Sequence, residues 1–220
     1  MKTPPTRIVI VRHGETDWNK LARVQGHEDI PLNDEGRRQT LLAANALAFE
    51  PITAVYSSDL RRAHDTALVL AEPHGLPVTL LETLRERNWG AWQGRTMVEI
   101  EEQDAAMYGR HRAGEWVNPE QAEVYDDLSR RVTGALERLA DAHAGECVLV
   151  ATHGGPVKTF TCHVLGAPLA AHNAMRTGNT GITTFLRRDG RFVLESYNVI
   201  THLTLPGSAP ESKLGIAEVL

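Results

Sequence analysis

Residues 7–16 read Arg-Ile-Val-Ile-Val-Arg-His-Gly-Glu-Thr, and this stretch decides the fold. The consecutive β-branched residues Ile8 to Val11 are typical of a strand that is buried on both faces of a sheet. The strand ends directly at Arg12 and His13. Ligands of α/β proteins bind outside the carboxyl ends of parallel strands, so the stretch predicts an α/β sheet with a binding site at this edge.

Two further predicted strands also end in polar clusters. Residues 54–56 lead into Ser57, Ser58 and Asp59, with Arg61 just beyond, and residues 147–152 lead into His153. If the three strands are parallel neighbours, their carboxyl ends bring two histidines and two arginines to one edge of the sheet.

The remaining pattern completes a single domain over residues 1–220. Helices are expected over residues 33–49 and over residues 120–142, where apolar residues recur at helical spacing. Another helix is expected directly after Asp59, which is predicted to cap its start. A short strand is expected near 78–81, and residues 181–187 and 191–198 predict an edge hairpin that turns at Asp189-Gly190. The expected fold is α/β, with a mostly parallel central sheet, helices on both faces, a lid-like insertion at about 88–122 and a C-terminal tail at about 201–220.

Composition narrows the function classes. The chain has 220 residues, 42% hydrophobic and 23% charged, with a formal net charge of −5, which argues against a nucleic-acid-coating protein. No stretch approaches the roughly 20 apolar residues of a membrane span, and the N-terminal apolar run is too short for a signal peptide, so we expect a cytoplasmic protein without membrane partners. Cys147 and Cys162 are expected as buried thiols rather than a disulfide, and no metal-ligand spacing is present.

The strand ends have the chemistry of an oxyanion site. Arg12 and Arg61 offer planar, bidentate N–H donors to a phosphoryl group. Pro156 is expected at the first position of a helix after His153, which leaves free N–H groups at its start, and Gly154 allows close approach of a ligand. A neutral His13 imidazole in line with phosphorus is a competent nucleophile. A histidine that is merely structural and surface arginines are the ordinary alternatives.

Five ordered motifs resemble the histidine phosphatase superfamily, whose members are phosphoglycerate-mutase-like. The similarity covers roughly residues 7–200. The motifs are Arg12-His13-Gly14-Glu15-Thr16 with Asn19, Pro31-Leu32-Asn33 with Gly36, Ser57 to Ala63 with Thr66-Ala67, Leu84-Arg85-Glu86 with Gly90 and Gly94, and Thr152-His153-Gly154-Gly155.

This resemblance implies a role for each matching residue. His13 would be the phosphorylated nucleophile, and Glu86 would protonate the leaving alcohol and then activate water. His153 would be the third catalytic residue and would contact the phosphoryl oxygens. The implied phosphate-binding residues are Arg12, Asn19, Arg61 and Gly154, and no cofactor or metal is implied.

Two positions depart from the family pattern. Gln121-Ala122-Glu123-Val124 stands where many members have Gly-Gly-Glu-Ser, so that only the glutamate remains. Gln93 stands where a glutamate is common.

The resemblance predicts the phosphatase branch, acting on a small phosphorylated metabolite. A bisphosphoglycerate-dependent mutase is the alternative, but those mutases carry a longer basic insertion, whereas residues 95–152 are short and acidic on balance. A catalytically silent phospho-ligand binder is a third hypothesis, and a homodimer is left open. Side chains of the middle region are candidates for facing substrate: Trp92, Tyr108, His111, Trp116 and the Gln121 loop.

Overall fold

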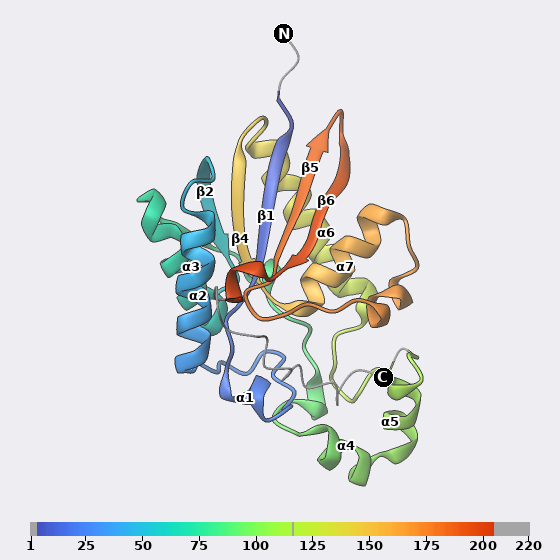
Figure 1. The fold of residues 1–220 in the computed structure, drawn as a ribbon. Helices are drawn as coiled ribbons and strands as arrows, with labels where there is room; N and C mark the ends of the chain where they lie inside the picture. Colours follow the sequence, from blue (N-terminus) through green and yellow to red (C-terminus); the bar gives the residue numbers. More distant parts are fainter. Residues whose placement is uncertain (1–3, 116, 205–220) are drawn as a thin grey trace.

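A six-stranded sheet forms the centre of the protein. The computed structural model describes residues 4–115 and 117–204, and its strand order is β3-β2-β4-β1-β5-β6 (Figure 1). The four strands β1 to β4 are parallel, whereas β5 and β6 form an antiparallel hairpin at one edge. The strand bounds are β1 Thr6–Arg12, β2 Ile52–Ser57, β3 Val78–Leu80, β4 Cys147–Thr152, β5 Ile182–Arg188 and β6 Arg191–Val199. The predicted α/β fold with a mostly parallel sheet and an edge hairpin is confirmed.

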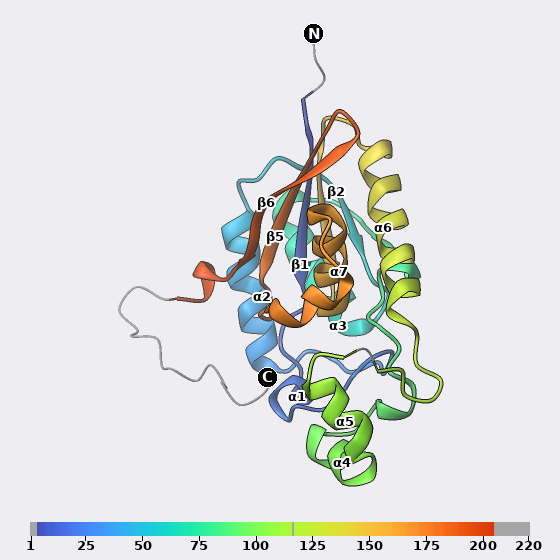
Figure 2. The ribbon, with the colours of Figure 1, turned by 90° about the vertical axis from the view of Figure 1, so that its right-hand side faces the viewer.

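Helices cover both faces of the sheet, as Figure 2 shows. Successive side chains of β1 point to opposite faces. Ile8 and Ile10 pack in one apolar cluster with α6 (Tyr125–Ala142) and α7 (Gly154–Leu165). Val9 and Val11 pack in the other cluster, with α2 (Asp34–Leu47) and α3 (Arg61–Ala71). The β-branched run is therefore buried from both sides, which is why it lacks the polar alternation of a half-exposed strand.

The helix starts differ in part from the sequence predictions. Asp59 does not cap α3, because its carboxylate forms a bidentate pair with Arg85, and Asp29 accepts the hydrogen bond from the Arg61 N–H instead, at 2.7 Å. Helix α6 begins at Tyr125 rather than near residue 120. Helix α7 begins at Gly154, so Pro156 occupies its third position rather than its first.

A small separate layer lies beyond the carboxyl ends of the strands (Figures 1 and 2). It contains α1 (Asp17–Lys20), α4 (Met97–Gln103) and α5 (Ala105–Arg112). Its own apolar cluster consists of Val24, Trp92, Ile100 and Val117. The segment predicted as a lid, residues 88–122, contributes most of this layer.

Short 3-10 helices complete the described chain. They span Glu72–His74, Glu82–Leu84, Gly90–Trp92, Leu169–Ala174 and Thr201–Leu203. The last of these is the start of the predicted tail, and residues 205–220 lie outside the described residues. Cys147 and Cys162 are free and buried, in agreement with the prediction. Within residues 4–115 and 117–204, no helix is both long and apolar enough to cross a membrane.

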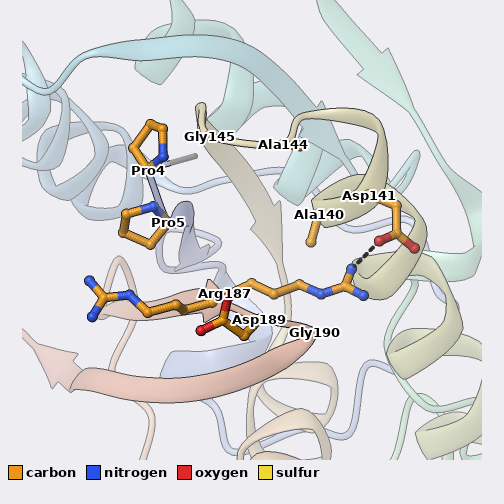
Figure 3. Close-up of a pocket in the computed structure, with 10 residues that line it drawn as sticks. Pro4, Pro5, Ala140, Asp141, Ala144, Gly145, Arg187, Asp189 and Gly190 are labelled. Carbon is orange, nitrogen blue, oxygen red and sulfur yellow. Dashed lines mark ion pairs between the residues drawn. The ribbon is translucent and has the colours of Figure 1, made fainter. Parts of the chain in front are cut away.

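A surface cavity of about 760 Å³ lies at the amino end of β1 (Figure 3). Pro4, Pro5 and the β5–β6 turn line it, together with the end of α6. Two of the charged side chains there pair with each other, since Arg187 forms a 2.7 Å ion pair with Asp141. This cavity is at the end of the sheet opposite to His13 and His153.

Candidate active site

The strand order brings the three predicted clusters to one edge. In the sheet Arg12 is opposite Thr152, and Ser57 is opposite Ala151. The backbone ladder continues past the strand ends, with the His13 N–H donating to the Thr152 carbonyl at 2.8 Å. The His13 and His153 rings consequently lie next to each other, with centroids 5.2 Å apart and planes inclined by 60°.

The turn after His13 is pressed against the start of α2. A Cβ added to Gly14 would lie 2.5 Å from the Gly36 carbonyl oxygen, and a Cβ added to Gly36 would lie 2.0 Å from the Glu15 carbonyl oxygen. Such distances are far inside van der Waals contact, so both positions require glycine. Gly14 and Gly36 come from separate sequence motifs, and both allow the backbone after His13 to pack closely against the start of α2. This packing fixes the position of His13.

The hydrogen bonds of His13 fix its tautomer. Its Nδ1 lies 2.7 Å from the Gly14 carbonyl oxygen, which can only accept, so Nδ1 carries the proton and Nε2 carries the lone pair of the neutral ring. Burial lowers the pKa of His13 well below its ordinary value, and the charges of Arg62 and Arg12 lower it further. The ring is therefore neutral at physiological pH, with a free lone pair on Nε2.

Arg62, rather than Arg61, lies with the histidines. The Arg61 side chain is 60% exposed and faces Asp65, whereas Arg62 is fully buried and donates to the carbonyls of Glu28 and Gly26, both at 2.7 Å. Burial lowers the pKa of Arg62 to about 10. The structure thus places Arg62, one residue further along the chain, where the sequence analysis expected Arg61.

The phase of α3 explains this difference. Its buried face contains residues 62, 63, 66, 67 and 70, so a side chain at 61 points outward. The apolar spacing of Ala63, Ala67 and Leu70 was a sequence signal that could have selected Arg62.

Three buried nitrogens around His13 have no hydrogen-bond partner among the described residues. They are Arg12 Nε, Arg62 Nε and His153 Nδ1. His153 Nε2 lies 2.9 Å from Ser58 Oγ, and no other acceptor for the Ser58 hydroxyl proton is found among the described residues. The hydroxyl therefore donates to Nε2, and the proton of the neutral ring resides on Nδ1. Unpaired buried donors are costly, and an oxyanion bound among them would satisfy all three.

Asn19 and Gly154 adjoin this cluster. Asn19 Oδ1 accepts from Thr16 and from the Asn179 side chain, and Asn179 also donates to the His13 carbonyl at 3.0 Å. Asn19 therefore ties α1 to the strand end. A Cβ at Gly154 would lie 3.1 Å from Thr177 Oγ1 and 3.8 Å from Arg12 Nε, which places this glycine beside the arginine.

The Glu86 side chain reaches the start of α7. Both carboxylate oxygens are 3.1 Å from the Gly155 nitrogen, where the positive end of the helix dipole stabilises an anion. A Cβ at Gly155 would lie 2.1 Å from Glu86 Oε1, so glycine is required there for the carboxylate to approach. The charge of Glu86 acts on both Arg12 and Arg62, which places it with the arginines.

Aromatic side chains surround the loop that follows Glu86. The Arg87 guanidinium lies 4.2 Å from the Trp89 ring centroid and 4.0 Å from that of Tyr125. Trp92 is buried, and both tryptophans make edge contacts with His111. Trp92 therefore contributes mainly to packing, and Trp116, another candidate, lies outside the described residues.

Lys158 is a residue that the sequence analysis missed. It follows Gly154 by one turn of α7, and no hydrogen bond or ion pair of Lys158 is found within the described parts of the chain. Its pKa is lowered by burial and by Arg12, and Glu86 opposes this effect. The Lys158 ammonium group, which has no partner in the described structure, therefore lies near Glu86, the candidate general acid. Among residues 4–115 and 117–204, no group of three potential metal ligands occurs.

A family model described as "Histidine phosphatase superfamily (branch 1)" matches residues 8–200. The chain belongs to the histidine phosphatase superfamily. Within this superfamily, a metal-independent phosphoserine phosphatase of Arabidopsis thaliana is 35% identical over 207 residues, covering 92% of this chain and 85% of the relative. A glucosyl-3-phosphoglycerate phosphatase of Mycolicibacterium vanbaalenii is 36% identical over 174 residues, covering 74% of this chain and 76% of the relative.

Solved histidine phosphatase structures are similar to the whole fold. The phosphoserine phosphatase of Entamoeba histolytica in complex with 3-phosphoglyceric acid superimposes with a TM-score of 0.81 at 31% identity, covering 90% of this chain and 100% of that structure. These relatives are phosphatases. The prediction of a hydrolase of the phosphatase branch is therefore confirmed, and a phosphatase is favoured over a mutase.

Proposed function

We propose that this histidine phosphatase hydrolyses phosphate monoesters of small metabolites, without a metal, through a phosphohistidine on His13. The observation that carries the proposal is the trio of buried unpaired N–H groups on Arg12, Arg62 and His153 around a neutral imidazole. This set neutralises the charge that develops on a transferring phosphoryl group.

The reaction has two steps. His13 Nε2 attacks phosphorus, the ester P–O bond breaks, and Glu86 gives a proton to the leaving alcohol oxygen. Glu86, now a carboxylate, then takes a proton from water as its oxygen attacks the phosphohistidine. The P–N bond breaks, inorganic phosphate leaves, and His13 returns to its neutral state. An alkoxide is a poor leaving group, which is why a proton donor at Glu86 is needed.

The leaving group of the preferred substrate carries a negative charge. Lys158 has no anionic partner in the described structure, and its charge acts near Arg12 and Glu86. Phosphoserine and 3-phosphoglyceric acid, the ligands in two structures of the Entamoeba histolytica phosphoserine phosphatase, both contain a carboxylate. A carboxylate on the alcohol would give Lys158 its partner.

Phosphate release in EDTA tests the proposed function. Wild type should release phosphate from p-nitrophenyl phosphate and phosphoserine, and His13→Ala should lose activity by on the order of 10⁴-fold or more. A radiolabelled phosphoryl group should remain on the wild-type protein after an alkaline quench, since phosphohistidine is stable in alkali. Activity of His13→Ala within tenfold of wild type would exclude the proposed nucleophile.

The same assays separate the alternatives. Conversion of 3-phosphoglycerate to its 2-phospho isomer, dependent on a bisphosphate, would indicate a mutase. Binding of phosphorylated ligands with no release of phosphate would indicate a silent binder. Light scattering of the purified protein would decide whether it is a homodimer, which the sequence leaves open.

A further inference from the structure

Glu123 is the one residue that remains of the divergent 121–124 motif, and the structure shows its partner. Arg131, in the second turn of α6, holds the Glu123 carboxylate with a bidentate pair of 2.6 Å and 2.9 Å. Both side chains are largely buried, with 21% and 16% exposed. A bidentate pair in this setting fixes the orientation of the guanidinium plane.

The other N–H groups of Arg131 all reach the backbone that carries Glu86. Nη1 donates to the carbonyls of Thr83 at 2.9 Å and Arg85 at 2.7 Å, and Nη2 donates to the Glu86 carbonyl at 2.8 Å. The five N–H groups of this guanidinium are therefore all used, three of them on the loop before and at Glu86.

Glu123 and His27 hold the same loop from other sides. The Glu123 N–H donates to the Asn88 carbonyl at 2.9 Å, and Glu123 Oε2 lies 3.3 Å from the Asn88 nitrogen. His27 Nε2 lies 2.8 Å from the Glu86 carbonyl oxygen. The backbone is thus fixed on both sides of Glu86, while its carboxylate rests on the start of α7.

We infer that Arg131, oriented by Glu123, is a positioning residue that holds Glu86 in place as the general acid. The inference rests on the proposed function, because it assigns Arg131 to the proton-transfer step. Arg131 touches the backbone of residues 83–86 through its hydrogen bonds, and its charge also acts on His153, where it helps to lower the pKa of that ring. General acid catalysis requires a heavy-atom distance of hydrogen-bond length, so a small shift of this loop removes much of the effect.

The test compares two leaving groups through kcat/KM, which reports the steps up to phosphoryl transfer. Arg131→Met should lose on the order of 10²-fold on phosphoserine but less than about threefold on p-nitrophenyl phosphate, whose leaving group needs little protonation. Arg130→Met is the matched control, since the neighbouring Arg130 side chain is 74% exposed and pairs with Asp127. The control should match wild type on both substrates. Equal losses of Arg131→Met on the two substrates would overturn the inference.

A double-mutant cycle separates positioning from general stability. In a Glu86→Gln background, Arg131→Met should cause little further loss on phosphoserine, because the proton donor is already absent. Additive losses would contradict the inference. Arg131→Lys, which keeps the charge and some donors, should recover part of the activity on phosphoserine.

Hydrogen exchange provides a readout that needs no activity. The amides of residues 83–88 should exchange faster in Arg131→Met and in Glu123→Gln than in wild type, and at the wild-type rate in Arg130→Met. Unchanged exchange in Arg131→Met would overturn the inference even if the protein were inactive. Turnover by wild type on p-nitrophenyl phosphate tests the proposed function separately, so the two failures are distinguishable.

Discussion

The two sides of the site are built from different kinds of structure. The phosphoryl side, which consists of Arg12, His13, Arg62 and His153, sits at strand ends and helix starts whose backbones are fixed by the sheet. The leaving-group side consists of Glu86 and Lys158. Lys158 lies on α7, but Glu86 and the aromatic side chains that follow it, Trp89 and Trp92, are held by 3-10 helices and loops between residues 82 and 124. Under the proposed function, the sheet fixes where phosphorus is bound, whereas side chains such as Arg131 fix where the proton donor is placed.

The largest expected effect concerns the phosphoryl side. Arg62→Met should lower kcat/KM on the order of 10²–10³-fold on every substrate, because it removes one fixed charged donor. Arg61→Met is the matched neighbour and should stay within threefold of wild type, since the Arg61 side chain is exposed. Steady-state kinetics on p-nitrophenyl phosphate measures both variants. A larger loss for Arg61→Met than for Arg62→Met would return the phosphate-binding role to Arg61.

A smaller and substrate-dependent effect is expected on the leaving-group side. Lys158→Met should lower kcat/KM by about tenfold on phosphoserine, which is about 1.4 kcal/mol of lost charge-assisted binding. It should have little effect on ethanolamine phosphate, which lacks only the carboxylate. Lys158→Arg should retain the preference for phosphoserine. Equal losses on the two esters would show that Lys158 does not bind the carboxylate.

The buried histidines predict a pH dependence of stability. The pKa values of His13, His153, His111 and His202 are lowered by burial, and that of His172 is lowered to about 4. Below the ordinary value of 6.5 the unfolded chain binds protons that the folded chain does not, so the free energy of unfolding falls as the pH falls. Urea denaturation between pH 7 and 5 should show this fall, by up to about 1.4 kcal/mol per pH unit for each histidine. A flat profile would mean that these rings are protonated in the folded protein.

The smallest effect is expected at the divergent motif. Gln121 adopts φ +62°, a left-handed conformation that disfavours side chains with a Cβ. Gln121→Gly should therefore raise the free energy of unfolding by up to about 1 kcal/mol and leave kcat/KM unchanged. Thermal and urea denaturation measure the change. A loss of stability would show that the Gln121 side chain makes contacts that outweigh the backbone strain.

The sequence predicted the fold and the convergence of the strand ends better than the arrangement of the loop that carries Glu86. Buried strands have an unambiguous pattern in sequence, as Ile8 to Val11 show, and their ends locate His13 and His153. The choice of Arg61 over Arg62 came from reading the motif without the phase of α3. The role of Arg131 leaves no sequence pattern, because its partners are backbone carbonyls 45 to 48 positions away. The helices within residues 88–122 could not be predicted from the sequence either, since α4 and α5 are short and depend on tertiary packing.

The cavity at Pro4, Pro5 and the β5–β6 turn (Figure 3) has a practical consequence, because it lies at the end of the sheet opposite to the histidines. A protein tethered to a bead or sensor surface through this end would present its catalytic edge to the solution. Coupling through α4 or α5 would instead place the support at the end of the molecule where the carboxyl ends of the strands and the histidines lie. Immobilised preparations attached at the two ends should therefore differ in substrate access while the fold is the same.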